Sequence, residues 1–449
     1  MRNMELTPAH ERHCGVHLQT GFLFFAPIEQ LSRFFLRQKR IVAERPSHGY
    51  RVPNLVKIQA IAACIFFWSL PAHATVITAA TCSSSDVQAA VNSAVNGDTV
   101  RTPGPCTVAW PGAPGVTISG KGITLDGGGN TTVTSVYAIL LQSSLTASAR
   151  VTGINFTGGG DLNNGDIRAT GSTSSAPFRI DHCTLSNGGT LIAVWNNAPG
   201  LIDHDTFNVG GAAETIHNFG MGAGNAAGWA DDIVPGGAKM LFIEDNVFNN
   251  SDPTYIAQSV EAYYGARTVV RHNTMNFVAV DEHGNSGTLN GVSARWWEIY
   301  QNTFSANGKA QCCNVTVRGG SGVIFGNAQS NNTAPGAITL KEDIGNGFPG
   351  SCSPPDPDLY HVGRGINSTL SPAFVWSNGT IPVNGDNCIR SGTEYRVSTS
   401  QPSNLMRCES AADQIAGCPV PYVYTPYQYP HPLQGSAVAA PTGLAFVIH

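Results

Sequence analysis

The stretch Ile180–Leu185, IDHCTL, is the first of six copies of one short phrase, and the last copy is IFGNAQ at Ile324–Gln329. Each copy has an apolar anchor residue, two variable positions, a small polar residue and a further variable position, and most copies end on a bulky apolar residue. The other copies are IDHDTF from Ile202, IEDNVF from Ile243, VRHNTM from Val270 and IYQNTF from Ile299. Their starts lie 22, 41, 27, 29 and 25 residues apart. A period in the twenties predicts a β-solenoid, in which the 41-residue step is one coil with an insertion.

Alternation of side chains along each phrase predicts which residues enter the core. Phe178 with Ile180, Leu241 with Ile243 and Trp297 with Ile299 are expected to point inward. The third residue after the anchor falls at a turn, and the amides found there predict a stacked ladder: Asn246, Asn273, Asn302 and Asn327. Cys183 occupies the same position and is expected to be a buried free thiol. Three histidines share the preceding turn position and are interpreted as solvated or stacked turn residues rather than a metal column: His182, His204 and His272.

The composition of the 449 residues favours many turns and stacked strands over a helical bundle. There are 50 Gly, and only 12% of residues are charged. The formal net charge is −5, and no Lys/Arg block follows residue 75. Nucleic acid is therefore not expected as a partner.

The beginning of the chain has the features of an export signal. An apolar run, Ile58–Leu70, follows Lys57 and precedes a small-x-small end at Ala72 and Ala74. The run is shorter than the 20 or so apolar residues that a membrane span needs, so residues 56–74 are predicted to be a signal peptide of a secreted protein without a membrane anchor. Residues 1–55 are expected to be an unstructured extension, which a start codon placed too early would explain.

The remaining chain is predicted to form regular coils at 75–345, with a capping helix within 83–95 over the open first coil. Residues 346–435 are expected to be an irregular segment that packs on the coils and is stapled by disulfides among Cys352, Cys388, Cys408 and Cys418. Its end, PYVYTPYQYPHPLQG, is rich in Pro and Tyr and should lie extended along their outside. Cys82 and Cys106 are expected to pair, and residues 436–449 to be a disordered tail.

The signal peptide, capping helix, coil length and Asn ladder together resemble the right-handed parallel β-helix proteins of the pectate-lyase-like superfamily. The resemblance covers roughly residues 80–345. It implies an all-β, right-handed parallel β-helix with an N-terminal capping helix, and we expect a monomer. That superfamily includes polysaccharide lyases, glycoside hydrolases, esterases, tailspikes and adhesins, so the resemblance does not specify an activity.

A second strand in each coil carries the chemistry-bearing residues. If Ile216, Val260, Val280, Val315 and Ile338 point into the core, their neighbours must point outward. The predicted outward residues share one face: His217, Glu261, Tyr263, Asp281, His283, Thr316, Arg318, Thr339 and Lys341. Aromatic, acidic and basic groups thus concentrate on one side of a charge-poor chain.

This mixture fits a lyase that acts on an acidic, uronic-acid polysaccharide. Arg318, Lys341 or a calcium ion held by Glu261 and Asp281 would neutralise the carboxylate, and His283 or Tyr263 would act as base or acid. The predicted catalytic residues are His283, Arg318, Tyr263, Glu261 and Asp281. Further substrate contacts are predicted at His217, Lys341, Trp229 and Arg295; Trp229 lies in the insertion, where a loop could wall a groove.

Two other functions remain open. A glycoside hydrolase needs two carboxyl groups, and Glu261 and Asp281 on neighbouring coils would lie near the roughly 5–5.5 Å of a retaining enzyme. A non-catalytic carbohydrate-binding or adhesion protein would use the same face only for contact, and a solvated strand face would carry such charges without any function.

Overall fold

The computed structural model describes residues 74–211, 213–221, 227–284, 292–330, 336–341, 360–386 and 388–435. Its contacts divide the chain into two units, Met1–Ala72 and His73–His449, and every described residue belongs to the second. The predicted extension, nearly all of the predicted signal peptide, Cys352 and the predicted tail lie outside the described residues. Within the described part, no helix is long and apolar enough to span a membrane.

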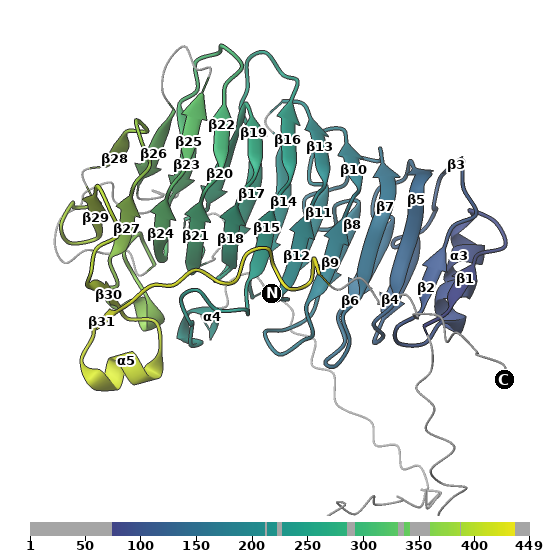
Figure 1. The fold of residues 1–449 in the computed structure, drawn as a ribbon, viewed down its shortest axis with the longest axis horizontal. Helices are drawn as coiled ribbons and strands as arrows, with labels where there is room; N and C mark the ends of the chain where they lie inside the picture. The colour runs from purple at the N-terminus through teal and green to yellow at the C-terminus, as the bar shows by residue number, and fades with distance from the viewer. Residues whose placement is uncertain are drawn as a thin grey trace, which may run out of the picture. The chain divides into compact units, whose positions relative to one another are not determined.

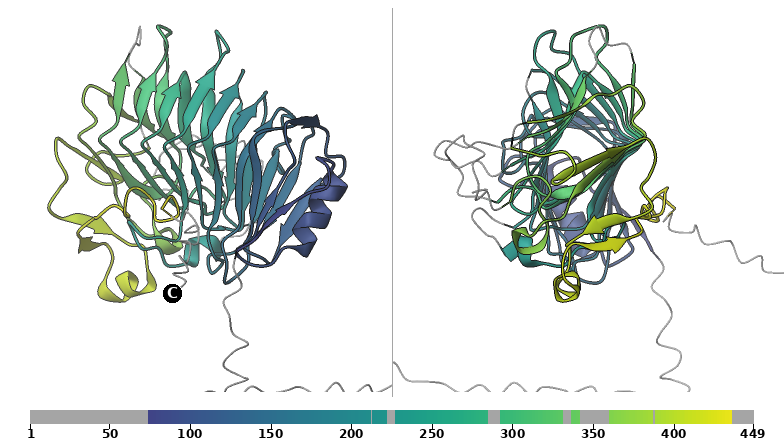
Figure 2. Two further views of the ribbon diagram at one scale, coloured as in Figure 1. Left: turned by 45° about the vertical axis from the view of Figure 1, so that its right-hand side comes forward. Right: turned by 90° about the vertical axis from the view of Figure 1, so that its left-hand side faces the viewer.

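The anchors of the repeated phrase lie on one column of parallel strands, shown in Figures 1 and 2. Ile180 pairs with Ile202, Ile202 with Ile243, and the pairing continues through Val270 to Ile299 and Ile324. The column comprises β1 (Val76–Thr78), β2 (Thr99–Arg101), β5 (Thr124–Val133), β7 (Arg150–Phe156), β9 (Phe178–Asp181), β12 (Gly200–Asp203), β15 (Leu241–Glu244), β18 (Arg267–Arg271), β21 (Trp296–Tyr300), β24 (Ser321–Phe325), β27 (Ala373–Trp376) and β29 (Tyr395–Ser398). The predicted parallel β-helix is confirmed, and the 41-residue step is a single coil.

Two further strand columns complete the coils. One follows the turn after each anchor: β3 (Cys106–Val108), β10 (Thr184–Ser186), β13 (Thr206–Val209), β16 (Val247–Asn250), β19 (Thr274–Asn276), β22 (Thr303–Ser305) and β25 (Ala328–Ser330). The other carries the predicted site: β4 (Val116–Ser119), β6 (Ile139–Gln142), β8 (Ile167–Thr170), β11 (Ile192–Trp195), β14 (Glu214–Phe219), β17 (Ala257–Tyr263), β20 (Val278–Glu282), β23 (Cys313–Val317), β26 (Ala337–Leu340) and β28 (Val383–Gly385). Inward residues of all three columns form one continuous core, which contains the predicted Phe178, Leu241 and Trp297.

The predicted Asn ladder is present at the turn after each anchor. Each side-chain amide donates to the side-chain oxygen of the next Asn at 3.0–3.1 Å, and the ladder runs from Asn246 through Asn273, Asn302 and Asn327 to Asn378. Cys183 and Asp205 occupy the same position in the earlier coils, and Cys183 is a buried free thiol as predicted. The turn residues beside the ladder adopt positive φ, and the rings of His182 and His204 stack 5.3 Å apart.

Asp205 is the weak position of this ladder, because its Oδ2 is buried without a hydrogen-bond partner. Burial raises the pKa of Asp205 well above its ordinary value, so the folded chain keeps a proton that the unfolded chain loses above about pH 4. Asp205→Asn is expected to raise the free energy of unfolding by about 1–2 kcal/mol at pH 7. Urea unfolding measures it: the gain should shrink towards pH 4, and a gain independent of pH would contradict this explanation.

A helix closes the first coil, as predicted. Helix α3 (Ser84–Ser93) starts at Ser83, whose side chain accepts from the backbone N–H of Asp86, and its buried side Val87, Ala90 and Val91 belongs to the core. Its apolar side covers core that would otherwise face water. Cys82 and Cys106 form the expected disulfide at this end.

The parallel column extends beyond the predicted boundary at residue 345. Val375 pairs with Ile324 and then with Val397, so β27 and β29 add coils within the segment expected to be irregular. Ile324 and Val375 are 51 positions apart, so a repeat period in the twenties does not predict this continuation. The remaining elements are α4 (Ala227–Ala230), η1 (Ile366–Ser368), α5 (Ala411–Ala416), β30 (Leu405–Arg407) and β31 (Val420–Tyr422).

The Pro- and Tyr-rich end lies along the outside of the anchor column, as predicted, and Figure 1 shows it crossing from β31 towards β9. Arg271 donates to the backbone carbonyls of Tyr427 and Gln428, and Arg179 donates to that of Leu433. Cys408 and Cys418, two of the four cysteines expected to form disulfides here, are joined by a disulfide bond. A further disulfide joins Cys312 to Cys313 in the coils. The C-terminal segment therefore covers the outside of the anchor column along these strands.

Candidate active site

The predicted outward residues do lie on one face of the third strand column. Strand pairing aligns His217 with Glu261, Glu261 with Asp281, Asp281 with Thr316, and Thr316 with Thr339. A second row lies two residues further along each strand and contains Tyr263, His283, Arg318 and Lys341. Neighbouring strands are about 4.8 Å apart, so the two rows bring acidic, basic and aromatic groups into contact.

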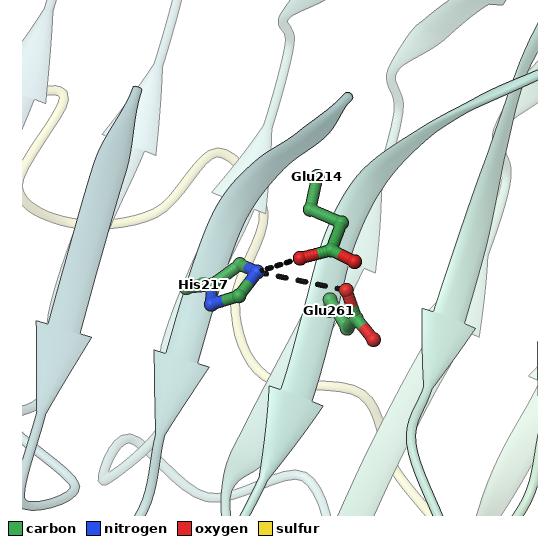
Figure 3. Close-up of side chains that lie close together, drawn as sticks. All are labelled: Glu214, His217 and Glu261. Atoms are coloured by element: carbon green, nitrogen blue, oxygen red, sulfur yellow. Dashed lines mark hydrogen bonds and ion pairs between the residues drawn. The ribbon is translucent and has the colours of Figure 1, made fainter. Parts of the chain in front are cut away.

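His217 lies between two carboxylates at the centre of this face. Its Nε2 is 2.6 Å from Oε2 of Glu214 and 3.5 Å from Oε2 of Glu261, as Figure 3 shows. The side chain of His217 has no exposed surface, whereas that of Glu214 is 33% exposed. His217 was predicted to contact substrate directly, but its burial instead makes it a residue that holds the two carboxylates together.

Glu261 connects this group to the second row. The hydroxyl of Tyr263 donates to Oε1 of Glu261, and Nε2 of His283 is 3.5 Å from the same oxygen. The rings of Tyr263 and His283 stack with centroids 4.2 Å apart. Nδ1 of His283 is 2.9 Å from the carbonyl oxygen of Gly284, which can only accept, so Nδ1 carries the proton and Nε2 keeps its lone pair.

Arg318 brings positive charge to the cluster. Its Nε and Nη2 donate to the two carboxylate oxygens of Asp281 at 3.0 and 2.7 Å, and Nη2 is 3.8 Å from Oε1 of Glu261. Gln258 also donates to Asp281 at 2.8 Å. Glu261, Asp281, His283, Tyr263 and Arg318 therefore converge as the sequence predicted. Lys341 is exposed and follows Arg318 in the second row.

The environment separates the pKa values of these groups. Burial raises the pKa of Glu261 to about 7, and burial together with the charge of Arg318 lowers the pKa of His283 to about 4. Burial opposes ionisation of Glu214, but its hydrogen bond with His217 prevails and lowers the pKa to about 2. Burial and the charge of Glu261 raise the pKa of Tyr263. Near pH 6 the site thus contains a neutral imidazole and a protonated carboxyl group, which suits paired base and acid catalysis.

Sequence reasoning missed Glu214 and Gln258. Strict alternation assigns both to the same side as Ile216 and Val260, which point inward. The pairing of β17 with β20 shifts register between Gln258 and Val260, which interrupts the alternation at Gln258. Glu214 pairs directly with Gln258, and both side chains contact residues of the outer face. A β-bulge reorients side chains in this way, and no residue of the stretch marks it.

An aromatic row extends the face towards the N-terminal coils. Ring centroids are 4.3 Å apart for Trp195 and Phe219 and 5.8 Å apart for Phe219 and Tyr263. Trp195 and Phe219 were also missed, although the two-residue alternation places them on this face. Beside the same strands, a cavity of about 430 Å³ is lined by Gly160, Leu162, Gly189, Thr190, Gly210, Ala213 and Glu214. Glu214 therefore links the cluster to open space.

Two predicted substrate contacts are wrong. Trp229 is 1% exposed; its indole N–H donates to the carbonyl of Ser293, and its ring packs against Tyr360 and Arg295. Arg295 was expected to point outward but is fully buried and bonded to Glu409. The insertion and the C-terminal segment cover both side chains, and the repeat alone does not reveal that docking.

The predicted calcium pair is not favoured by this arrangement. Asp281 already accepts hydrogen bonds from Nε and Nη2 of Arg318, and this positive charge balances its carboxylate in place of a cation shared with Glu261. Within the described ranges, the group with suitable spacing is Glu214, His217 and Glu261, whose ligand atoms all lie within 4.8 Å of one another. A proton on His217 already balances the negative charge of this group. Burial alone would lower the pKa of His217, but the two carboxylates raise it.

Comparison with known proteins adds little to this geometry. No protein-family model and no curated protein matches the chain. Among solved structures, a family 6 polysaccharide lyase from Pseudopedobacter saltans aligns with a TM-score of 0.36 and 11% sequence identity, over 79% of this chain and 97% of that protein. Similarity at this level does not establish a family for the chain.

Proposed function

We propose that this protein is a secreted lyase that cleaves an acidic, uronic-acid polysaccharide by β-elimination. The observation that carries the proposal is the contact of Glu261 with Tyr263, His283 and Arg318 on one outer face of the coils. The three groups supply what elimination needs: a base, a proton donor and a positive charge near the uronate.

His283 is the base in this reaction. Its Nε2 lone pair takes the proton on the carbon beside the uronate carboxylate, and the electron pair released forms the carbon–carbon double bond. The bond between the neighbouring carbon and the glycosidic oxygen breaks. The Tyr263 hydroxyl turns from Glu261 to give its proton to that oxygen, and it takes the carboxyl proton of Glu261 in exchange. Arg318 stabilises the charge that develops on the uronate carboxylate.

A glycoside hydrolase is the second candidate, and the pair Glu214–Glu261 specifically favours it. The pKa of one carboxyl group is about 2 and that of the other about 7, as expected for a nucleophile and an acid. In the predicted pair Glu261–Asp281, by contrast, Asp281 accepts two hydrogen bonds from Arg318. A hydrolase would produce new reducing ends without a double bond.

Incubation with a panel of polyuronates tests the proposal. We expect the ultraviolet absorbance of an unsaturated uronate product with at least one of them, and no loss of activity in the presence of a chelator. A panel that yields new reducing ends without this absorbance would support the hydrolase instead. Binding without either signal would leave a carbohydrate-binding protein.

The pH profile of kcat/KM is expected to be bell-shaped. His283 is neutral above about pH 4, and Glu261 is protonated below about pH 7, so activity should lie between these values. Glu261→Gln cannot ionise and is expected to lose the alkaline limb while its activity falls. An unchanged alkaline limb in this variant would assign that limb to another group.

Export is part of the proposal. The disulfides Cys82–Cys106 and Cys408–Cys418 suit an oxidising compartment. Mass spectrometry of the protein recovered outside the cytoplasm is expected to show an N-terminus at Thr75. An N-terminus upstream of Ile58 would contradict cleavage of the predicted signal.

A further inference from the structure

An arginine lies on the outer face of the third strand column, two strands before the catalytic cluster. The backbone hydrogen bond from Ile167 to Leu191 aligns Arg168 of β8 with Ala193 of β11, and Ala193 pairs with His217. Arg168 therefore belongs to the same row of outward side chains as His217, about 10 Å away across two strand spacings. It is the one charged residue in the four described strands β4, β6, β8 and β11.

The loop that precedes β8 fixes the side chain of Arg168. Nη1 of Arg168 donates to the side-chain oxygen of Asn164 at 3.1 Å, and the guanidinium lies over the ring of Trp195, 4.9 Å from its centroid. The indole N–H of Trp195 donates to the carbonyl oxygen of Asn163 at 2.8 Å. Asp161 holds the loop by accepting the backbone N–H groups of Asn163 and Asn164. Both side chains thus have fixed positions before a ligand binds, which limits the entropy lost on binding.

One side of this guanidinium is available to a ligand. Nε of Arg168 is buried and cannot reach one. Nη2 has no hydrogen-bond partner in the described part of the chain and is not buried, so it is open to solvent. Asp161 forms no ion pair with Arg168, and its oxygens accept N–H groups of the loop instead. The positive charge thus rests on an aromatic ring and a neutral amide, and it can bind an outside carboxylate without giving up an ion pair.

An aromatic row and open space connect this arginine with the catalytic cluster. Trp195, over which Arg168 lies, begins the aromatic row that reaches Tyr263. The cavity of about 430 Å³ beside these strands is lined by Leu162, from the loop that holds Arg168, and by Glu214 of the cluster. A sugar chain that crosses the strands at Tyr263 would therefore pass over Arg168 within a few sugar units.

We propose that Arg168 binds the carboxylate of a uronate unit that lies several units from the cleaved bond, a role that rests on the acidic polysaccharide substrate proposed above. Nη2 donates to this carboxylate, and Trp195 keeps the guanidinium in place. Arg318 and Lys341 lie on the other side of the base His283, so uronate units are bound on both sides of the cleaved bond. A neutral sugar unit would gain nothing from Arg168, so the site selects chains that are acidic along their length.

Titration calorimetry with oligomers of two lengths tests this site in the His283→Gln protein, which binds substrate without cleaving it. The probes are the hexamers and trimers of galacturonate, mannuronate and guluronate. A trimer held at His283 is too short to reach Arg168, which lies about 19 Å away across four strand spacings. Addition of Arg168→Met is expected to weaken binding of a hexamer at least about tenfold and binding of its trimer less than about twofold.

Two further variants show that the charge is responsible. Arg168→Lys keeps the charge and should retain part of the hexamer affinity, whereas Arg396→Met, which removes an exposed arginine on β29, should bind as its parent does. If Arg168→Met does not fold, Arg168→Gln takes its place with the same expectation. Equal losses for hexamer and trimer, an unchanged hexamer affinity, or a parent protein that binds no hexamer would overturn the proposal.

Failure of this site and failure of the lyase function are distinguishable, because calorimetry does not require cleavage. If the wild-type protein cleaves no polyuronate but hexamer affinity still depends on Arg168, the binding site stands and the lyase function does not. If polyuronate is cleaved with a double bond but hexamer affinity is independent of Arg168, the lyase function stands and this binding site does not.

Discussion

Replacing His283 with glutamine is expected to lower kcat for polyuronate cleavage by about 10²–10⁴-fold while leaving the fold intact. Nε2 of the neutral His283 imidazole keeps its lone pair at pH 6, because the carbonyl oxygen of Gly284 holds the proton on Nδ1. Glutamine keeps a polar side chain beside Tyr263 and Glu261 but cannot accept the proton. Substrate affinity should change much less than kcat, since the base acts mainly in the transition state.

Two controls separate this effect from general damage. His204→Gln changes a histidine that lies at a turn and is 43% exposed, and it should retain wild-type kinetics. The unfolding temperature of the His283→Gln variant should remain within a few degrees of the wild-type value. Full activity of a folded His283→Gln protein would remove His283 from the mechanism.

Replacing Arg271 with methionine is expected to lower the free energy of unfolding by about 3–5 kcal/mol. Arg271 is fully buried; it pairs with Glu244, donates to the hydroxyl of Tyr300 at 2.8 Å, and donates to two backbone carbonyls of the C-terminal segment. Methionine fills a similar volume but leaves the carboxylate of Glu244 buried without its counter-ion. Equilibrium unfolding in urea measures the loss.

The double variant Arg271→Met with Glu244→Gln provides the matched control. It removes both charges, so part of the lost stability should return if the unpaired carboxylate causes the loss. Limited proteolysis should also cleave residues 420–435 faster in the single variant, because their docking on Arg271 is lost. A single variant less than about 1 kcal/mol below the wild type would show that this pair does not secure the segment.

The anchors and their spacing were sufficient to predict the coils. Every second residue of each strand points into the core and must be apolar. Ile202 and Ile243 pair directly although they are 41 positions apart, since an insertion in a loop does not change the register of the strands it joins. The same logic correctly aligned His217, Glu261 and Asp281.

The remaining site features depend on contacts that the repeat does not encode. A register shift interrupts the alternation at Gln258, with which Glu214 pairs, and a bulge cannot be predicted from alternation. Trp229 and Arg295 looked exposed because the sequence does not show that the C-terminal segment, through Glu409, packs over that region. Such docking joins residues more than a hundred positions apart, where local spacing carries no information.

The mass of the products formed in oxygen-18-labelled water tests the central claim most directly. β-Elimination breaks the glycosidic bond without adding water, so the products made by the wild-type protein from a polyuronate should carry a double bond and no label from the cleavage step. Hydrolysis through Glu214 and Glu261 would place one labelled oxygen at the new reducing end. Unsaturated, unlabelled products that disappear with His283→Gln are the predicted result; saturated, labelled products would contradict the lyase mechanism.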